Sequence, residues 1–233
     1  MAKFILNRPD DYLTLSRGEI IGSALKWWFV LFAGALVLHA ECYVLYKSMG
    51  VDPEEITENI LRSLLDKQFG KVFLFVGLYG PLVEEMLFRL GLSFKRKTVA
   101  LWAGFLPILL TLSLLRSKGC WDILPWTVII GVCLFWLICR YTTDEQWTNW
   151  RKKFIIPAMW ISTIIFGLMH MMNFSVLNLQ VFPYVFVAIL PQMACGCALA
   201  YVRVNQGFWW GVLLHCIYNQ MVLLFAHTAS NIA

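Results

Sequence analysis

Three short polar motifs interrupt long apolar stretches of this chain. The first, Glu84-Glu85-x-x-x-Arg89, lies inside LYGPLVEEMLFRLGLSF, residues 78–94. A charged side chain at the centre of a bilayer costs at least ~2.5–3.5 kcal/mol on insertion scales, so these groups must pair or face a polar interior. Glu85 and Arg89 are four residues apart and can form an ion pair on one helix face. Glu84 lies about 140° from Arg89 around the axis, so its own helix offers it no partner.

The second and third motifs place imidazoles and amides on two later apolar stretches. Phe166-x-x-x-His170 is followed one turn later by Asn173, and His215-x-x-x-Asn219 lies near the end of the chain. Residues four apart share a helix face, so each motif forms a small polar patch. Lipid would reject all of these groups, and we expect them to line one water-containing cavity.

A carboxylate, two imidazoles and an amide are suited to hydrolysis. A carboxylate and a histidine can hold and deprotonate a water molecule, and the remaining imidazole and amide can donate hydrogen bonds to an oxyanion. Glu84, His170 and His215 would also be suitable zinc ligands. The sequence has no HExxH spacing, so a zinc site would have to be assembled from three helices. We favour no cofactor and keep zinc as the alternative.

Composition indicates what must position these groups. Apolar residues make up 60% of the 233 residues and charged residues only 14%, whereas soluble domains have about 25% charged residues. Seven apolar runs each approach the roughly 17–25 residues that a membrane-spanning helix needs. The predicted fold is all-α, a polytopic transmembrane helix bundle of about seven spans plus short interfacial helices. The runs cover roughly residues 27–46, 72–94, 98–115, 121–139, 154–172, 179–202 and 207–226.

Several details refine this helix prediction. Pro183 and Pro191 can break the sixth run. His170 lies about 25 Å along a helix from Lys153, so the fifth helix either begins well outside the bilayer, in EQWTNWRKKF, or has other bounds. Residues 47–71 have the spacing of an amphipathic surface helix, and the N-terminal tail is interfacial rather than a signal peptide. We expect residues 1–70 to hold the tail, the first span and this amphipathic helix, and residues 71–233 to form the core that carries the three motifs.

Lysine and arginine positions predict the orientation. With seven spans, twelve of these cations lie on the side of the N-terminus, with Arg203 counted as a loop residue, and six lie opposite. Positive loops stay in the cytoplasm, which predicts a multi-pass protein of the cell (inner) membrane with a cytoplasmic N-terminus and an external C-terminus. The net charge of +5 is modest and gathers in short loops, so we expect the lipid bilayer and not a nucleic acid as partner. The seven cysteines form no CxxC pair, and we expect no disulfide framework.

Taken in order along successive apolar runs, the three motifs resemble those of the CAAX protease and bacteriocin-processing family, also called Abi, which includes the Rce1-like prenyl-protein endopeptidases. The resemblance covers roughly residues 71–226. The stretch ACGCALAYVRVNQGFWWGVLLHCIYN is similar to the small-residue helix, basic turn and aromatic entry that precede the last motif in that family. The position of Asn173, three residues after His170, is also similar to the second motif of that family.

The resemblance implies an intramembrane endopeptidase (a hydrolase) that acts on a membrane-embedded or membrane-associated peptide or protein. Matched by motif, Glu84 and His170 would activate the water, and His215 and Asn219 would form the oxyanion site. Glu85 and Arg89 would support the helix, and Phe166 and Asn173 belong to the second motif.

Two other functions stay open at this stage. A non-catalytic membrane adaptor or bacteriocin-immunity protein on the same fold would use the cavity to bind a partner. A proton-coupled transporter would use intramembrane Glu and His side chains as a relay. Transporters are commonly built from inverted repeats with matched broken helices, and we find none in this sequence.

Overall fold

The computed structural model describes residues 16–51, 68–118, 121–174 and 179–230. These residues form helices joined by short connections, with no strand among them, so the predicted all-α class is confirmed. The N-terminal tail before residue 16 and most of the expected amphipathic helix lie outside the described residues. The helices are α2 (Arg17–Ser48), η2 (Phe75–Tyr79), α5 (Gly80–Arg89), η3 (Leu90–Ser93), α6 (Arg96–Lys118), η4 (Trp121–Ile123), α7 (Leu124–Tyr141), α8 (Asp144–Met169), η5 (His170–Asn173), α9 (Phe182–Ala188), α10 (Leu190–Gln206) and α11 (Phe208–Ser230).

Within the described residues, four helical segments are long and apolar enough to cross a membrane. They are Ile21–Ser48, Trp121–Tyr141, Asp144–Asn173 and Phe182–Gln206, and Phe208–Leu224 is a shorter apolar helix. The expected count of seven spans is therefore not confirmed. The run at 72–94 is not among these four; it carries Glu84, Glu85 and Arg89 and contains the π-helix η2, the ten-residue α5 and the 3₁₀-helix η3.

Prolines and caps explain the bounds of the later helices. The sixth run divides at Ile189 into α9 and α10, and a proline stands in the first turn of each helix, where its missing N–H costs nothing. Helix α8 begins at Asp144 behind a capping box between Thr143 and Gln146. It therefore starts well before the apolar part of the run. Of the two alternatives for this helix, an early start or different bounds, the structure shows the early start.

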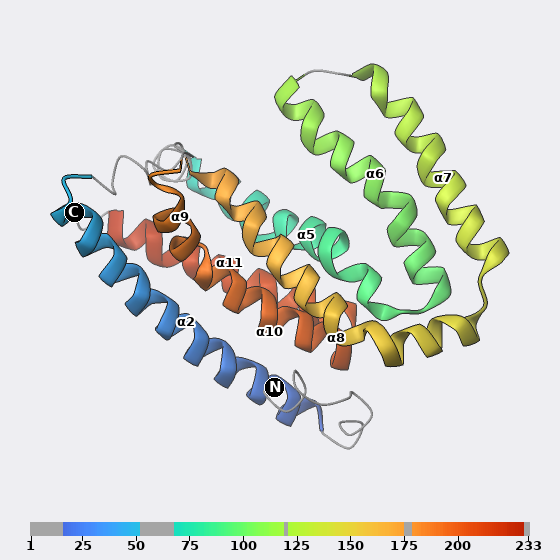
Figure 1. Cartoon of the computed structure of the whole chain (residues 1–233), viewed down its shortest axis with the longest axis horizontal. Helices are drawn as coiled ribbons and strands as arrows, with labels where there is room; N and C mark the ends of the chain where they lie inside the picture. The colour runs from blue at the N-terminus through green and yellow to red at the C-terminus, as the bar shows by residue number, and fades with distance from the viewer. Residues whose placement is uncertain (1–15, 52–67, 119–120, 175–178, 231–233) are drawn as a thin grey trace.

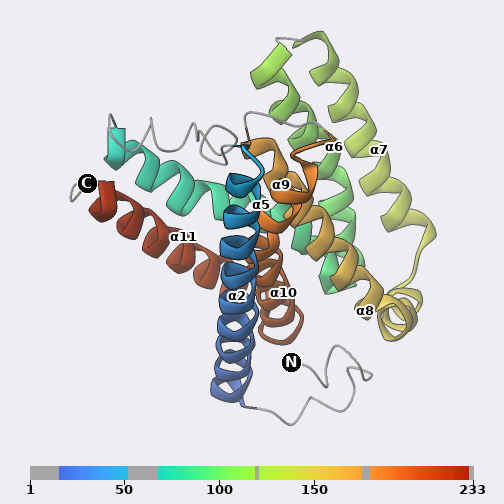
Figure 2. The same ribbon diagram turned by 60° about the vertical axis from the view of Figure 1, so that its left-hand side comes forward.

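Helix α10 is the centre of the packing. It contacts α2, α8 and α11, and Figures 1 and 2 show these three helices around it. Every residue from Ala194 to Arg203 is buried. Small alanine, glycine and cysteine side chains in this stretch let neighbouring backbones come close. Arg203 was expected in a loop, but it lies inside α10 with only 7% of its surface exposed.

Helices α6 and α7 form a hairpin beside the other helices (Figures 1 and 2). The two helices cross with their backbones almost touching at Gly104 and Gly131. A Cβ built on Gly131 would lie 2.2 Å from the carbonyl oxygen of Gly104, so only glycine fits there. The hairpin packs mainly on itself and meets the rest of the chain through η3 and α5.

Candidate active site

Helix α5 carries the first motif into the middle of the molecule. Glu85 and Arg89 are both fully buried and form the expected i,i+4 ion pair. Removing one partner of such a buried pair leaves an uncompensated charge and typically costs about 3–5 kcal/mol. Glu84, on a different face of the helix, keeps 32% of its side chain exposed. The first motif therefore consists of one enclosed ion pair and one accessible carboxylate.

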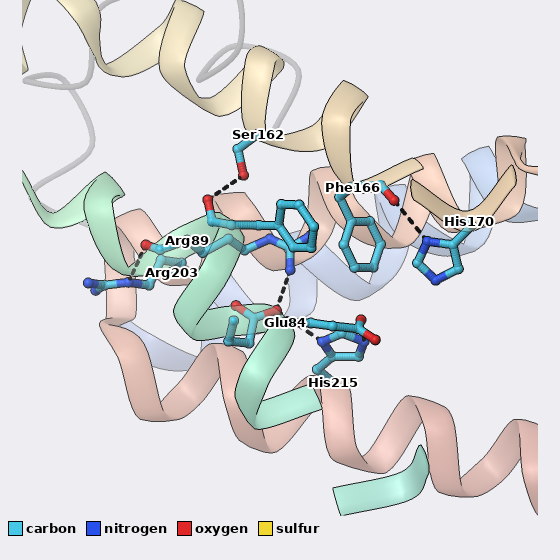
Figure 3. A network of polar contacts seen from close by, with 9 residues as sticks. Glu84, Arg89, Ser162, Phe166, His170, Arg203 and His215 are labelled. Atoms are coloured by element: carbon cyan, nitrogen blue, oxygen red, sulfur yellow. Dashed lines mark hydrogen bonds and ion pairs between the residues drawn. The ribbon is translucent and has the colours of Figure 1, made fainter. Parts of the chain in front are cut away.

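His215 of α11 lies close to both glutamates, and Figure 3 shows it beside Glu84. Its Nδ1 is 3.0 Å from Oε1 of Glu85, and its Nε2 is 3.5 Å from Oε2 of Glu84. An ionised carboxylate only accepts hydrogen bonds, so Nδ1–H of His215 donates to Glu85. The imidazole is 2% exposed. One buried ring thus connects the first and third motifs, which lie on separate helices.

A close helix contact makes this connection possible. A Cβ built on Gly211 would lie 3.2 Å from Oε2 of Glu85, so a larger residue there would crowd the carboxylate, and glycine lets the start of α11 lie close to α5. Gly211 precedes His215 by one turn on the same face of α11. The sequence carries a signal for this contact, a glycine four residues before the motif histidine. The contact itself was not predicted.

Phe166 of α8 joins the second motif to the same cluster. The guanidinium of Arg89 lies over its ring, 4.3 Å from the centroid. The rings of His170 and His215 both pack on it, with centroid distances of 4.7 and 5.7 Å. The two imidazoles are therefore no farther apart than the sum of these distances. All three motifs meet around one aromatic ring.

His170 has its tautomer set by the backbone. Its Nδ1 lies 2.8 Å from the carbonyl oxygen of Phe166, and because a carbonyl only accepts, Nδ1 carries the proton. The neutral ring then has its lone pair on Nε2, where it can act as a base. No contact among the described residues joins His170 directly to Glu84. The ion-pair partner of Glu84 is His215, and Figure 3 shows His170 facing these two side chains from η5, just after the end of α8.

Asn219 and Asn173 lie at the edges of the cluster. The amide of Asn219 donates to the carbonyl oxygen of Val76 in η2 at 2.9 Å. Asn219 lies one turn after His215 on α11. One of its two amide N–H groups is used in the hydrogen bond to the π-helix. Asn173 ends η5 and is exposed.

The zinc alternative was tested on the positions of the possible ligands. In the described part of the chain, no three His, Cys, Asp or Glu side chains are grouped so that they could hold a metal ion. Glu84 and His215 are adjacent, but His170 meets them only through the ring of Phe166. The expected set of Glu84, His170 and His215 does not fit a zinc ion in this arrangement.

Comparison with known proteins agrees with the motifs. Residues 137–221 match the family model described as type II CAAX prenyl endopeptidase Rce1-like. The matched segment runs from the end of α7 through most of α11 and holds the second and third motifs, whereas Glu84, Glu85 and Arg89 lie outside it. No curated protein matches the chain, and no solved structure does. Over residues 137–221 the chain is thus similar to the Rce1-like type II CAAX prenyl endopeptidases, the family that its three motifs resemble.

Proposed function

We propose that this protein is an intramembrane endopeptidase that hydrolyses a peptide bond of a membrane-associated peptide or protein. Its family is one of endopeptidases, and its long apolar helices are those of a membrane protein. The observation that carries the proposal is the meeting of Glu84 and His215 beside the Phe166 ring that also holds His170. These groups come from three helices that are far apart in the sequence.

In the proposed reaction, Glu84 acts as the general base. Its partly exposed carboxylate accepts a proton from a water molecule, and the water oxygen attacks the carbonyl carbon of the substrate peptide. Nε2 of His215 lies 3.5 Å from the Glu84 carboxylate, and the lone pair on Nε2 of His170 accepts a second hydrogen bond from the water. The carbon–nitrogen bond then breaks, the proton passes from Glu84 to the leaving amine, and a carboxylic acid and an amine are released.

His215 and Asn219 are the proposed donors to the oxyanion. Preorganised donors of this kind usually supply a large part of the transition-state stabilisation in acyl transfer. They lie one turn apart on α11, next to Glu84, which supports the assignment. Asn219 keeps a second N–H besides the one bound to Val76, and protonated His215 can donate from Nε2.

We also propose that the protein crosses the cell membrane several times, with a cytoplasmic N-terminus and an external C-terminus. The lysine and arginine bias supports this orientation, and it does not depend on Arg203, which lies inside α10. The functional core within residues 71–233 is supported by the contacts of α5, α8, α10 and α11 with one another.

Cleavage by the purified protein in liposomes tests this function. One probe is a quenched fluorescent peptide with a prenylated cysteine three residues before its last residue, and a second is an unprenylated single-span peptide. We expect cleavage of at least one probe, with Glu84→Gln and His170→Gln both reducing it to background. Glu145→Gln, in the exposed first turn of α8, is the matched control and should cleave like the wild type. Full cleavage by folded Glu84→Gln would contradict the mechanism.

One observation favours a second function. Glu84 pairs with His215 and makes no direct contact with His170, so the two groups proposed to share a water are not joined. A non-catalytic membrane adaptor on the same fold would have no need for that contact. Such a protein should bind the peptide probes without cleaving them, and Glu84→Gln should leave the binding unchanged.

A further inference from the structure

The last carbonyl groups of α5 are held by side chains from three other helices. A helix leaves its final four carbonyls without a partner inside the helix. Here Leu87 accepts from Nε1 of Trp102 at 2.8 Å, and Phe88 accepts from the hydroxyl of Ser162 at 2.8 Å. Arg89 and Leu90 both accept from Arg203, from Nε at 3.1 Å and from Nη2 at 3.2 Å. Four consecutive carbonyls therefore each have a side-chain donor.

Arg203 is the strongest of these contacts. Its guanidinium is buried, and it lies at the end of α5 where the helix dipole is negative. Burying a charge in an apolar bundle is costly unless it is well hydrogen-bonded. The planar fork of arginine can reach two successive carbonyls at once, which the single ammonium group of lysine cannot do in the same geometry. The side chain therefore fixes both the position and the rotation of the helix end.

The stem of Arg203 also lies at the start of α11. A Cβ on Gly211 would lie 3.8 Å from Cβ of Arg203 and 3.2 Å from Oε2 of Glu85. Arg203 thus stands where α5, α10 and α11 meet. At the other end, η2 is bound to α11 by Asn219 and by the thiol of Cys216, which donates to Leu78 at 3.8 Å. The segment that carries Glu84 and Glu85 is held from both sides.

We propose that Arg203, with Ser162 and Trp102, is a positioning residue that sets the register of α5 so that Glu84 and Glu85 reach His215. It does not touch the reacting atoms. The anchored carbonyl of Arg89 is about 7.5 Å along the helix axis from Glu84, since each residue rises 1.5 Å. A stiff helix transmits a shift over that distance, so freeing its end would loosen the contacts of His215. This inference rests on the proposed hydrolase function only in its effect on cleavage.

The four histidines of the chain allow a direct test without a substrate. Protein labelled with ¹⁵N-histidine in detergent micelles gives side-chain nitrogen signals for four rings, each assigned by a His→Gln variant. In Arg203→Met we expect the His215 nitrogen signals to move and those of His39 and His227 to stay in place. Arg203→Lys, which keeps the charge but not the fork, should move them less. Arg140→Met, at the exposed end of α7, is the matched control and should move none.

Kinetics on the cleaved peptide probe give the second readout. We expect Arg203→Met to lower kcat about a hundredfold with little change in KM, because a misplacement of ~1 Å can cost that much in rate. Arg203→Lys should recover part of the rate. If neither probe is cleaved by any variant, the hydrolase function fails while the histidine signals still decide the positioning role.

Two results would overturn the inference. Folded Arg203→Met with unchanged His215 signals would show that the helix end does not control the site. Equal movement of all four histidine signals would show a general structural role instead. If Arg203→Met does not fold, Ser162→Ala is the second variant, because it removes only one donor to α5. An unchanged His215 signal in folded Ser162→Ala would also contradict the positioning role.

Discussion

The α6–α7 hairpin and the cluster of α5, α8, α10 and α11 use similar apolar sequences for different purposes. In the candidate span that contains α7, an 18-residue stretch has a mean hydropathy of 2.1, and 6% of that stretch is buried within the protein. In the candidate span of α9 and α10, the corresponding stretch has a mean hydropathy of 1.9, and 67% of it is buried. Hydropathy therefore does not distinguish a helix on the outside of the protein from one that forms its core. Side-chain size does, because α10 is rich in small residues and α7 in Trp, Phe and Ile.

The two regions also differ in where they hold charge. In the hairpin the described charged side chains, such as Arg96, Asp122 and Arg140, lie at helix ends. In the cluster, Glu85, Arg89 and Arg203 are buried. Small residues and glycines let the backbones close around these groups and hydrogen-bond them. Polar chemistry in this protein therefore depends on close helix packing. Variants that alter either the cluster or the hairpin should have different effects.

The largest effect is expected from breaking the buried ion pair. Arg89→Met removes the partner of Glu85 and should destabilise the protein by about 3–5 kcal/mol. Equilibrium unfolding in mixed micelles measures the change. Arg140→Met removes an exposed arginine of the hairpin and should change the unfolding free energy by no more than about 0.5 kcal/mol. Equal effects of the two variants would remove the distinction between the regions.

A smaller effect is expected from separating the hairpin. Gly131→Leu places a side chain where the backbone of Gly104 lies, and overpacking of this kind costs about 1–3 kcal/mol. Gly22→Leu, where a Cβ meets nothing within 4 Å, is the control for leucine in a helix. Because α7, which carries Gly131, contributes no group to the proposed site or to the anchor of α5, the cleavage rate of folded Gly131→Leu should match that of the control. A large loss of cleavage would mean that the hairpin takes part in the reaction.

The smallest effect concerns an exposed carboxylate outside the membrane spans. At the start of α2, the hydrogen bonds between Ser16 and Glu19 lower the pKa of the Glu19 carboxyl below its usual value. A lowered pKa in the folded state means that the carboxylate stabilises this helix end above the unfolded pKa near 4.5 and loses the effect as pH falls through the lower folded value. Hydrogen exchange of this first turn, corrected for the intrinsic rate, should therefore increase below that pH. Ser16→Ala should weaken the pH dependence, because the backbone N–H of residue 16 still donates to Glu19, whereas Glu19→Gln should remove it.

Local spacing accounts for what the sequence predicted correctly. The ion pair between Glu85 and Arg89 follows from helix geometry. For the fifth run the sequence left two alternatives, and the structure shows the early start, at Asp144. The count of seven spans was less successful. Hydropathy cannot reveal that the run at 72–94 is divided by a π-helix and a 3₁₀-helix.

Tertiary contacts were beyond the reach of the sequence. That one imidazole, His215, meets both glutamates depends on how α11 lies against α5 at Gly211. Arg203 was predicted to lie in a loop, because a basic residue shortly before Asn205-Gln206-Gly207 is typical of the end of a helix. Its role needs the carbonyls of α5, which no pattern in its own helix indicates.

Distances between glutamate carboxyl carbons and histidine ring nitrogens test the central claim most directly. Solid-state NMR on protein labelled with ¹³C at the glutamate carboxyls and ¹⁵N in histidine, in lipid, measures them without any substrate. The account predicts strong dipolar couplings from both nitrogens of His215, which lie 3.0 and 3.5 Å from the oxygens of Glu85 and Glu84. Glu84→Gln should remove the coupling to Nε2 alone. A His215 ring with no glutamate carboxyl near either nitrogen would contradict the meeting of the motifs and the hydrolase built on it.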